Sequence, residues 1–486
     1  MKAKISTEFW VVLSLFMIAL WVRFYRLDAA SLSDDEIITS LRINHSFLTT
    51  IGLLRHSEYP PFYYAILNLW ADIFGKSEWA LRLPSALFSG LTVFVVYQIG
   101  KELFSKTVGV IAASLLAVSP FAVVFAQNAK MYPLLWLLAA MSFLYFFRYL
   151  KDPKTFSLVP NTVTLILSCY TMYIGFLFLV TQTVIFMLMA ERGRWGKWFK
   201  GQLIVVLCVL PWLIWFLCSK HEVWSDLRSP GASFDYPAFF LSSFQWIIGS
   251  VGAFRPQFSV RSCAFVVNIL LNVFLITFFL IETVIVSYKN KKWWDASSMH
   301  YYCLLVWIVV PAVIYFIFDR FFVPAQLGVR FIGFLQVSVI LLISCRIDGF
   351  RMPVKRILVL SLIALSIINT APAYTGEHQE APEGWQVTAE QLTQRLENKD
   401  IVLSFLDIAM FKYYFKGDTS RFYRTSRPDI TLDDLKQKGV FTSQVRSIYI
   451  LYHEDMAPDI DIGGFYLKDS VFNNGMGFLH FKKDST

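Results

Sequence analysis

Four acidic side chains lie close together in the sequence near the N-terminus. Asp34, Asp35 and Glu36 are consecutive, and Glu58 follows shortly after them in the stretch "HSEYPPFYY". A carboxylate can accept the proton of a hydroxyl group while that oxygen attacks a carbon atom, and neighbouring carboxylates acquire separated proton affinities. Carboxylate oxygens are also hard ligands that suit a divalent cation. The cluster could therefore activate a hydroxyl nucleophile or hold a metal ion.

The same acids also fit a purely structural interpretation. Ser33 followed by Glu36 three residues later is a capping box, and acids in a first helical turn complement the helix dipole. The pattern predicts a helix over 34–49 that lies on the membrane surface with one apolar stripe, formed by Ile37, Ile38, Leu41 and Leu48. Capping accounts for Glu36 but leaves Asp35 unexplained, so both interpretations stay open.

Two basic residues stand beside aromatic residues at the ends of apolar segments. Lys130 lies in "FAQNAKMYPLL" with Tyr132 nearby, and Arg330 lies in "GVRFI" next to Phe331. Fixed positive charges in a partly dry site stabilise a phosphate group. A basic residue beside an aromatic one is also a common membrane anchor, with its charge extended towards water. Phosphate binding and anchoring are both open for each residue.

The composition places these residues in an integral membrane protein. Hydrophobic residues make up 56% of the 486 residues, aromatic residues make up 17%, and the mean hydropathy is +0.52. Apolar runs long enough to cross a bilayer recur over the first 370 or so positions. We predict eleven membrane-spanning helices, at 8–24, 82–103, 107–126, 132–149, 156–173, 174–191, 202–219, 262–287, 300–318, 331–346 and 357–373.

The distribution of Lys and Arg predicts how the chain is oriented. Short loops between alternate spans are basic, for example around Lys101 and Lys106 and around Arg346 and Arg351. Because Lys and Arg favour cytoplasmic loops, we expect a multi-pass plasma (inner) membrane protein with a cytoplasmic N-terminus. The outer loops are then 25–81, which carries the acids, and 220–261. The net charge of +9 needs no nucleic acid partner to explain it.

The C-terminal part of the chain has a different composition. Residues 371–486 hold 13 basic and 17 acidic side chains, whereas the whole chain holds 44 and 35. After the Gly- and Pro-rich stretch "APAYTGEHQEAPEGW", the patterns predict helices in "TAEQLTQRLE" and "DIAMFKYYF". They predict strands in "DIVLSFLD", "SIYILYHED", "GGFYLKDSVF" and "GFLHFKK". We therefore predict a transmembrane domain over 1–373 and a small α/β domain over 374–486 on the outer face.

The order of these features resembles the GT-C glycosyltransferases that use polyprenyl-phosphate-linked sugars, namely the bacterial relatives of protein O-mannosyltransferases and the lipid A aminoarabinose transferases. The resemblance rests on one span followed by Asp35-Glu36, then on Glu58-Tyr59-Pro60-Pro61 and "RLPS", and on the segments around Lys130 and Arg330. It implies a GT-C type fold with about 11 transmembrane helices, interfacial helices in the first outer loop and the C-terminal α/β domain.

The resemblance also implies an activity. A hexosyl or pentosyl group would move, with inversion, from a polyprenyl phosphate such as undecaprenyl phosphate to a hydroxyl of a glycan, lipid or protein acceptor. Asp35 would be the base, and Glu58 would orient hydroxyl groups or share that role. Lys130 and Arg330 would bind the leaving phosphate. The other expected substrate-binding residues are Asp34, Glu36, Tyr59 and Tyr132, with Glu36 mostly structural.

Tyr59 departs from the pattern of the aminoarabinose transferases, which carry a Lys after the acid of the second motif. This departure favours a mannosyltransferase-like enzyme over one that uses an aminoarabinose donor. Asp34, Asp35 and Glu58 could hold a divalent cation, but transfer from a monophosphate lipid does not require one, and we predict no metal site. The alternatives are a transporter of a lipid-linked or small substrate and a non-catalytic envelope assembly protein, neither of which needs Asp35 or Glu58.

Overall fold

The computed structural model divides into two compact units. It describes residues 7–55, 59–218, 296–321, 329–374, 384–404, 408–415, 417–424, 445–453, 462, 465–473 and 476–483. One unit contains residues 1–27 and 42–375, and the other contains 28–41 and 376–486. The short segment 28–41, which carries Asp34, Asp35 and Glu36, thus groups with the C-terminal part of the chain.

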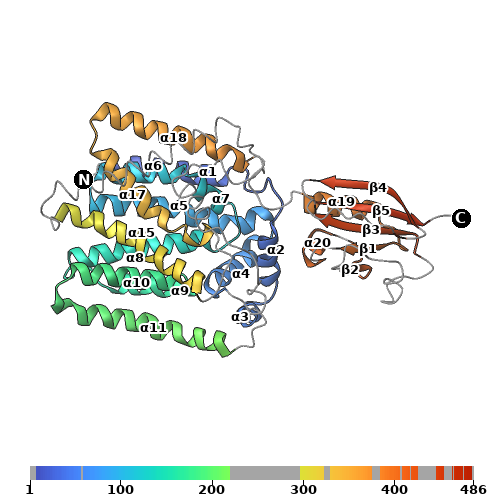
Figure 1. Ribbon diagram of the computed structural model, residues 1–486, viewed down its shortest axis with the longest axis horizontal. Coiled ribbons are helices and arrows are strands. Elements are labelled where there is room, and N and C mark those ends of the chain that lie inside the picture. Colours follow the sequence, from blue (N-terminus) through green and yellow to red (C-terminus); the bar gives the residue numbers. More distant parts are fainter. Residues whose placement is uncertain are drawn as a thin grey trace. The chain divides into compact units, whose positions relative to one another are not determined.

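The first unit is built from long helices that run alongside one another (Figure 1). They are α1 (Thr7–Phe24), α5 (Glu78–Leu103), α6 (Lys106–Ala117), α7 (Pro120–Ala126), α8 (Tyr132–Lys151), α9 (Val159–Thr171), α10 (Gly175–Met189), α11 (Trp195–Cys218), α15 (Ala296–Phe321), α16 (Val329–Ile332), α17 (Leu335–Asp348) and α18 (Met352–Tyr374). Two shorter helices, α3 (Phe47–Leu54) and α4 (Phe62–Phe74), precede α5, and the 3-10 helix η1 (Arg192–Arg194) precedes α11.

Ten of the eleven predicted spans coincide with these helices, and the predicted span 262–287 lies outside the described residues. Within the described residues, five helices are long and apolar enough to cross a membrane, namely α1, α5, α8, α15 and the helix that ends at Cys218. The bent pair α6 and α7 would count as a sixth. The chain is therefore a multi-pass membrane protein, with helices close to most of the predicted positions.

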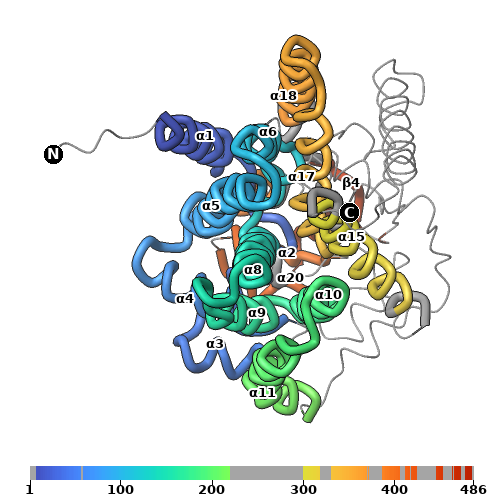
Figure 2. Tube along the Cα trace, turned by 90° about the vertical axis from the view of Figure 1, so that its left-hand side faces the viewer, coloured from blue at the N-terminus to red at the C-terminus, as the bar shows by residue number. Residues whose placement is uncertain are grey.

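Helix α8 lies in the interior of the helical unit, in contact with α5, α9 and α10 (Figure 2). Large aromatic side chains fill the space around it: the rings of Phe143 and Trp307 stack with centroids 3.6 Å apart. Next to it, α5 and α6 approach closely at Gly100 and Gly109, where a Cβ on Gly100 would lie 2.7 Å from the Cα of Gly109. Small residues that let helix backbones meet are typical of membrane helix pairs.

The chain bends by 54° between α6 and α7. Ser119 caps α7 through its hydroxyl, which accepts from the N–H of Ala122, and Pro120 begins the new helix because it needs no N–H partner there. The last carbonyls of α6 are satisfied by the buried guanidinium of Arg23, which donates to Leu116 and Ala117 at 3.1 and 2.7 Å. A buried arginine thus stabilises the break in this predicted span.

The predicted helix over 34–49 is wrong in its extent, because two helices occupy this region. Helix α2 ends at Arg42, and α3 begins at Phe47. The side-chain amide of Asn68 on α4 donates to the carbonyls of Ile43 and His45, at 2.9 and 3.0 Å. A continuous helix would use those carbonyls for its own backbone hydrogen bonds. Helix α4 follows at Phe62–Phe74, also within the first outer loop, where the resemblance implies helices.

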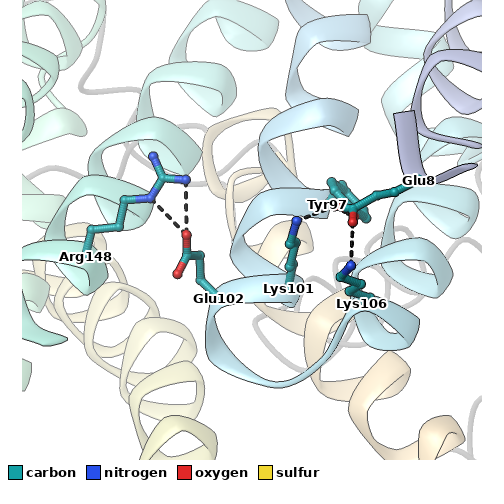
Figure 3. Close-up of polar contacts among 6 residues, drawn as sticks. All are labelled: Glu8, Tyr97, Lys101, Glu102, Lys106 and Arg148. Atoms are coloured by element: carbon teal, nitrogen blue, oxygen red, sulfur yellow. Dashed lines mark hydrogen bonds and ion pairs between the residues drawn. The ribbon is translucent and has the colours of Figure 1, made fainter. Parts of the chain in front are cut away.

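The turn between α5 and α6 carries a charged network (Figure 3). Glu8 at the start of α1 forms ion pairs with Lys101 and with Lys106, the latter at 2.6 Å. Glu102 pairs with Arg148 of α8 at 3.2 Å. These contacts join the turn between α5 and α6 to the start of α1 and to the end of α8.

The second unit contains a five-stranded sheet with the strand order β2-β1-β3-β5-β4 (Figure 1). Strand β1 is parallel to β2 and β3, while β5 is antiparallel to β3 and β4. The predicted strands and helices of this α/β domain are confirmed, whereas the short strand β2 was not predicted. The elements are α2 (Asp34–Arg42), α19 (Gly384–Arg395), β1 (Ile401–Ser404), α20 (Ile408–Tyr414), β2 (Phe422–Arg424), β3 (Ser447–His453), β4 (Phe465–Asn473) and β5 (Met476–Lys483).

Candidate functional site

The predicted capping box at the start of α2 is confirmed. The hydroxyl of Ser33 accepts from the backbone N–H of Glu36 at 3.3 Å. In return, the Glu36 carboxylate accepts from the Ser33 N–H at 2.9 Å and from its hydroxyl at 3.1 Å. Glu36 is only 1% exposed. Its carboxylate is therefore committed to the helix start, as the structural interpretation expected.

The other two acids of α2 are in different surroundings from Glu36. Asp34 is exposed at the first position of the helix, and Asp35 is half-buried. The carbonyl of Asp35 accepts from the hydroxyl of Thr39 at 2.8 Å, which is an ordinary contact inside a helix. The capping bonds join Ser33 and Glu36 and do not involve the Asp35 carboxylate. Glu58 lies outside the described residues.

Two cations contact the aromatic ring of Tyr59. The ammonium of Lys130 lies 5.6 Å from the ring centroid, and the guanidinium of Arg42 lies 5.5 Å from it. Arg42 also donates to the hydroxyl of Tyr64 at 3.2 Å. An aromatic face attracts a cation through the negative charge of its π-system. The sequence predicted Tyr59 and Lys130 as site residues but did not single out Arg42 or Tyr64.

The position of Lys130 is fixed by the motif "RLPS" in α5. The Ser85 hydroxyl donates to the carbonyl of Lys130 at 3.0 Å, and the Tyr63 hydroxyl lies 3.2 Å from the same serine oxygen. All three side chains are buried, with Lys130 3% exposed. A lysine held this far from water carries its charge into a partly dry environment, where electrostatic interactions are strong.

Pro84, next to Ser85, explains how this part of α5 is joined to α4. A proline inside a helix has no N–H to donate, so the carbonyl four residues earlier loses its usual partner. That carbonyl, on Ala80, accepts from the indole N–H of Trp70 at 3.0 Å. Arg82 is buried nearby and donates to the carbonyl of Leu27 at 3.0 Å, in keeping with a structural role.

A third cation, Arg330, lies close to the aromatic ring of Tyr132. The guanidinium of Arg330, in α16, lies 6.0 Å from the ring centroid of Tyr132 and 5.3 Å from that of Phe331. The rings of Tyr132 and Phe331 meet edge to face, 6.0 Å apart. Arg330 therefore contacts the aromatic residue that stands two positions after Lys130, although the two predicted cations are 200 positions apart in the sequence.

The acids and the cations belong to different units of the structure. Asp34, Asp35 and Glu36 lie in the unit formed by 28–41 and 376–486, whereas Lys130 and Arg330 lie in the helical unit. Among the residues that the structure describes, no group of three or more His, Cys, Asp or Glu side chains could hold a metal ion. The possible ligand set of Asp34, Asp35 and Glu58 includes a residue outside those described.

Part of the chain matches a known protein family. The family described as Dolichyl-phosphate-mannose-protein mannosyltransferase matches residues 58–215, about a third of the chain. This region contains Glu58, Tyr59 and Lys130. No curated protein matches the chain.

Solved structures of membrane glycosyltransferases share the fold over nearly the whole chain. ArnT from Cupriavidus metallidurans, bound to undecaprenyl phosphate, is 13% identical with a TM-score of 0.58, and the match covers 98% of each chain. Its apo state gives a TM-score of 0.60. AglB, the oligosaccharyltransferase of Archaeoglobus fulgidus in complex with an inhibitory peptide and a dolichol-phosphate, is 12% identical with a TM-score of 0.51, over 91% of this chain and 69% of AglB. The chain thus has the GT-C fold that its motifs predicted.

Proposed function

We propose that this protein is a membrane glycosyltransferase that moves a sugar from a polyprenyl phosphate to a hydroxyl group of an acceptor. The observation that carries this proposal is the placement of two cations, Lys130 and Arg330, on aromatic rings in a chain with the GT-C fold. Lys130 is buried and Arg330 is half-buried. A lipid phosphate is the anion that such a pair of cations in a membrane protein suits best. The undecaprenyl phosphate bound to ArnT and the dolichol-phosphate bound to AglB support this choice of donor.

In the proposed reaction, the acceptor oxygen attacks the anomeric carbon of the sugar. The new bond forms between that carbon and the acceptor oxygen, and the bond from the carbon to the phosphate oxygen breaks. Asp35 takes the proton of the acceptor hydroxyl, and Glu58 orients the hydroxyl groups of the acceptor or sugar or shares the base role. Direct displacement inverts the configuration at the anomeric carbon. The polyprenyl phosphate leaves with the electron pair and one further negative charge.

Lys130 and Arg330 stabilise the charge that develops on the departing phosphate. Charge stabilisation by fixed donors in a dry site is worth more than in water, because the donors are already in place when the charge appears. Tyr59 and Tyr132 position these cations through their rings. Asp34, which is exposed on α2, contacts an acceptor or sugar hydroxyl, whereas Glu36 acts through the helix cap.

We place the reaction on the outer face of the plasma membrane, with the N-terminus in the cytoplasm. The support for this orientation is the basic character of the loops at Lys101 to Lys106 and at Arg346 to Arg356. Tyr59 in place of a Lys favours a mannosyltransferase-like donor over aminoarabinose. The acceptor is a glycan, a lipid or a protein, and the transferred group is a hexosyl or pentosyl unit. The proposal includes no metal step.

The test is the transfer of radiolabelled sugar from a panel of polyprenyl-phosphate donors in membranes that contain the parent protein or Asp35→Asn. We expect the parent to transfer label and the variant, at equal expression, to be slower by roughly 10²- to 10⁴-fold, the usual contribution of a general base. A parent protein that transfers no sugar from any polyprenyl phosphate would contradict the proposed function. Equal rates for the two proteins would contradict the role of Asp35.

A further inference from the structure

Helix α2 is held to the C-terminal domain by two consecutive tyrosines of α20. The hydroxyl of Tyr414 accepts from the backbone N–H of Leu32 at 2.6 Å. The hydroxyl of Ser40, in the last turn of α2, donates to the hydroxyl of Tyr413 at 3.2 Å. Leu32 and Ser40 are both buried, at 0% and 2% exposure. One tyrosine therefore holds the entry to α2 and the other holds its end.

Helix α20 is in turn fixed to the sheet of its own domain. Phe411 is fully buried in the same core cluster as Phe415 and Phe422. The ring centroids of Phe411 and Phe422, the first residue of strand β2, lie 5.7 Å apart. The rings of Tyr413 and Tyr414 also contact each other edge to face, 5.1 Å apart. A continuous series of contacts therefore leads from the sheet through α20 to α2.

The two tyrosine hydrogen bonds are made to Leu32 and Ser40, which lie on either side of Asp35 in the sequence. Leu32 immediately precedes the capping box of Ser33 and Glu36, so Tyr414 acts on the residue that sets where the helix begins. Ser40 lies about 140° around the helix from Asp35, at about 100° per residue. The attachment therefore holds α2 near both of its ends, with Asp35 between the two contacts.

We propose that Tyr413 and Tyr414 are positioning residues for the base Asp35, so that the C-terminal domain takes part in transfer by holding α2. This inference rests on the proposed function, because it assigns a purpose to the placement of Asp35. A base must lie within hydrogen-bonding reach of the acceptor hydroxyl, and misplacement by about 1 Å can reduce the rate about 10²-fold. The phosphate-binding cations belong to the other unit, so donor binding should not depend on the tyrosine hydroxyls.

The test uses the full-length protein in membranes with both hydroxyls removed, as the double variant Tyr413→Phe and Tyr414→Phe. This change keeps both rings and removes the two hydroxyls that bond Leu32 and Ser40. The matched control is Tyr466→Phe, which removes an exposed phenol hydroxyl from strand β4 of the same domain. We expect the double variant to lose about 10-fold or more in kcat while its KM for the donor stays within about twofold, since the loss affects the placement of the base rather than donor binding.

Hydrogen exchange in the same proteins separates positioning from a general loss of structure. In the double variant, the backbone amides of residues 32–41 should exchange faster, while those of β3 and β5 should keep their protection. A parent-like kcat, or a donor KM that rises as much as kcat falls, would overturn the inference. Faster exchange throughout β3 and β5, or an equal loss of kcat in Tyr466→Phe, would also overturn it, because either result points to the stability of the whole domain.

Failure of this inference is distinguishable from failure of the proposed function when Asp35→Asn is measured in parallel. If Asp35→Asn is inactive and the double variant is fully active, the base assignment stands and the tyrosines do not position it. If Asp35→Asn transfers sugar at the parent rate, Asp35 is not the base and the positioning role falls with it. Loss of kcat in both, with unchanged donor KM in the double variant, supports both proposals.

Discussion

The two sets of reactive groups in the proposed site are held in different ways. The cations of the helical unit lie against aromatic rings on helices packed in the membrane, with Lys130 fixed by Ser85 of α5. Asp35 lies on the nine-residue helix α2, which groups with the C-terminal domain and is attached to it by two tyrosine hydroxyls. The proposed roles therefore predict that donor binding depends on the helical unit and that activation of the acceptor depends on the other unit.

Among substitutions in the helical unit, the largest effect should follow from removing the charge of Lys130. Lys130→Met keeps the length and apolar character of the side chain, and we expect transfer to fall roughly 10²- to 10³-fold, the range seen when one fixed donor to a developing negative charge is removed. The donor KM should rise as well, because the lysine also contacts the ground-state phosphate.

The transfer rate, measured against donor concentration, tests this prediction. Two variants serve as controls. Lys130→Arg retains the charge and should keep more of the activity. Lys76→Met removes an exposed lysine of the same unit, one that donates to Asn44, and should leave transfer unchanged. If Lys130→Met retains the parent rate and donor KM, Lys130 is a membrane anchor rather than a phosphate ligand.

Removing the ring of Tyr59, which contacts two cations, should reduce transfer by a smaller factor. Tyr59→Leu removes the aromatic face next to Arg42 and Lys130, and we expect a loss of about 2- to 30-fold in kcat/KM, which corresponds to a cation–π energy of about 0.5–2 kcal/mol. Tyr59→Phe keeps the face and should stay within about twofold of the parent. Equal losses in the two variants would show that the hydroxyl, not the ring, is the important group.

The C-terminal domain should lose stability in mild acid. His480 is 7% exposed and stacks on Tyr449 with ring centroids 4.3 Å apart, and burial lowers the pKa of His480 below its usual value. An opened state then binds a proton at a higher pH than the folded state does, so stability falls as the pH drops through about 6.5 and below.

Hydrogen exchange of β3 and β5 in the full-length protein, corrected for intrinsic rates, can measure this effect. Between pH 7.5 and 5.5, protection should fall by on the order of 1 kcal/mol, within the limit of about 1.4 kcal/mol per pH unit for one proton. His480→Phe keeps a stacking ring and should remove most of the pH dependence. The same slope in parent and variant would exclude His480 as its source.

The smallest effect is expected at the charged network between α5 and α8. Glu102 pairs with Arg148 and both side chains are partly exposed, so Glu102→Gln should change stability by about 1 kcal/mol or less. Thermal unfolding in detergent and the sugar-transfer rate measure the two consequences. We expect unchanged transfer, and a loss comparable to that of Lys130→Met would mean that the two regions are not independent.

Much of the fold could be predicted because its helices and strands follow from the order of apolar and polar residues in short stretches of sequence. Long apolar runs identified ten helices at predicted positions, and the alternation in "SIYILYHED" and "GFLHFKK" identified β3 and β5. The break between α2 and α3 could not be predicted, because it depends on Asn68, a residue of another helix that binds two carbonyls. The short strand β2 was missed because three residues give too little pattern.

The candidate site was predictable only in part. The capping box of Ser33 and Glu36 is a local signal, and the structure confirms it. The catalytic and substrate-binding roles of Asp35, Glu58 and Arg330 stay predictions. Arg42 had no signal in the sequence, since an arginine in a last helical turn is ordinary. Tyr413 and Tyr414 were expected only as helix residues, because their contact with a segment some 370 positions earlier is set by tertiary structure.

The most direct test of this division of roles is to measure kcat and donor KM for Asp35→Asn in membranes with the preferred polyprenyl-phosphate sugar. The account predicts that kcat falls by about 10²-fold or more while the donor KM stays close to that of the parent, since Asp35 acts on the acceptor proton. A variant that keeps its kcat but needs much more donor would contradict the account, because Asp35 would then belong with the groups that bind the lipid phosphate sugar.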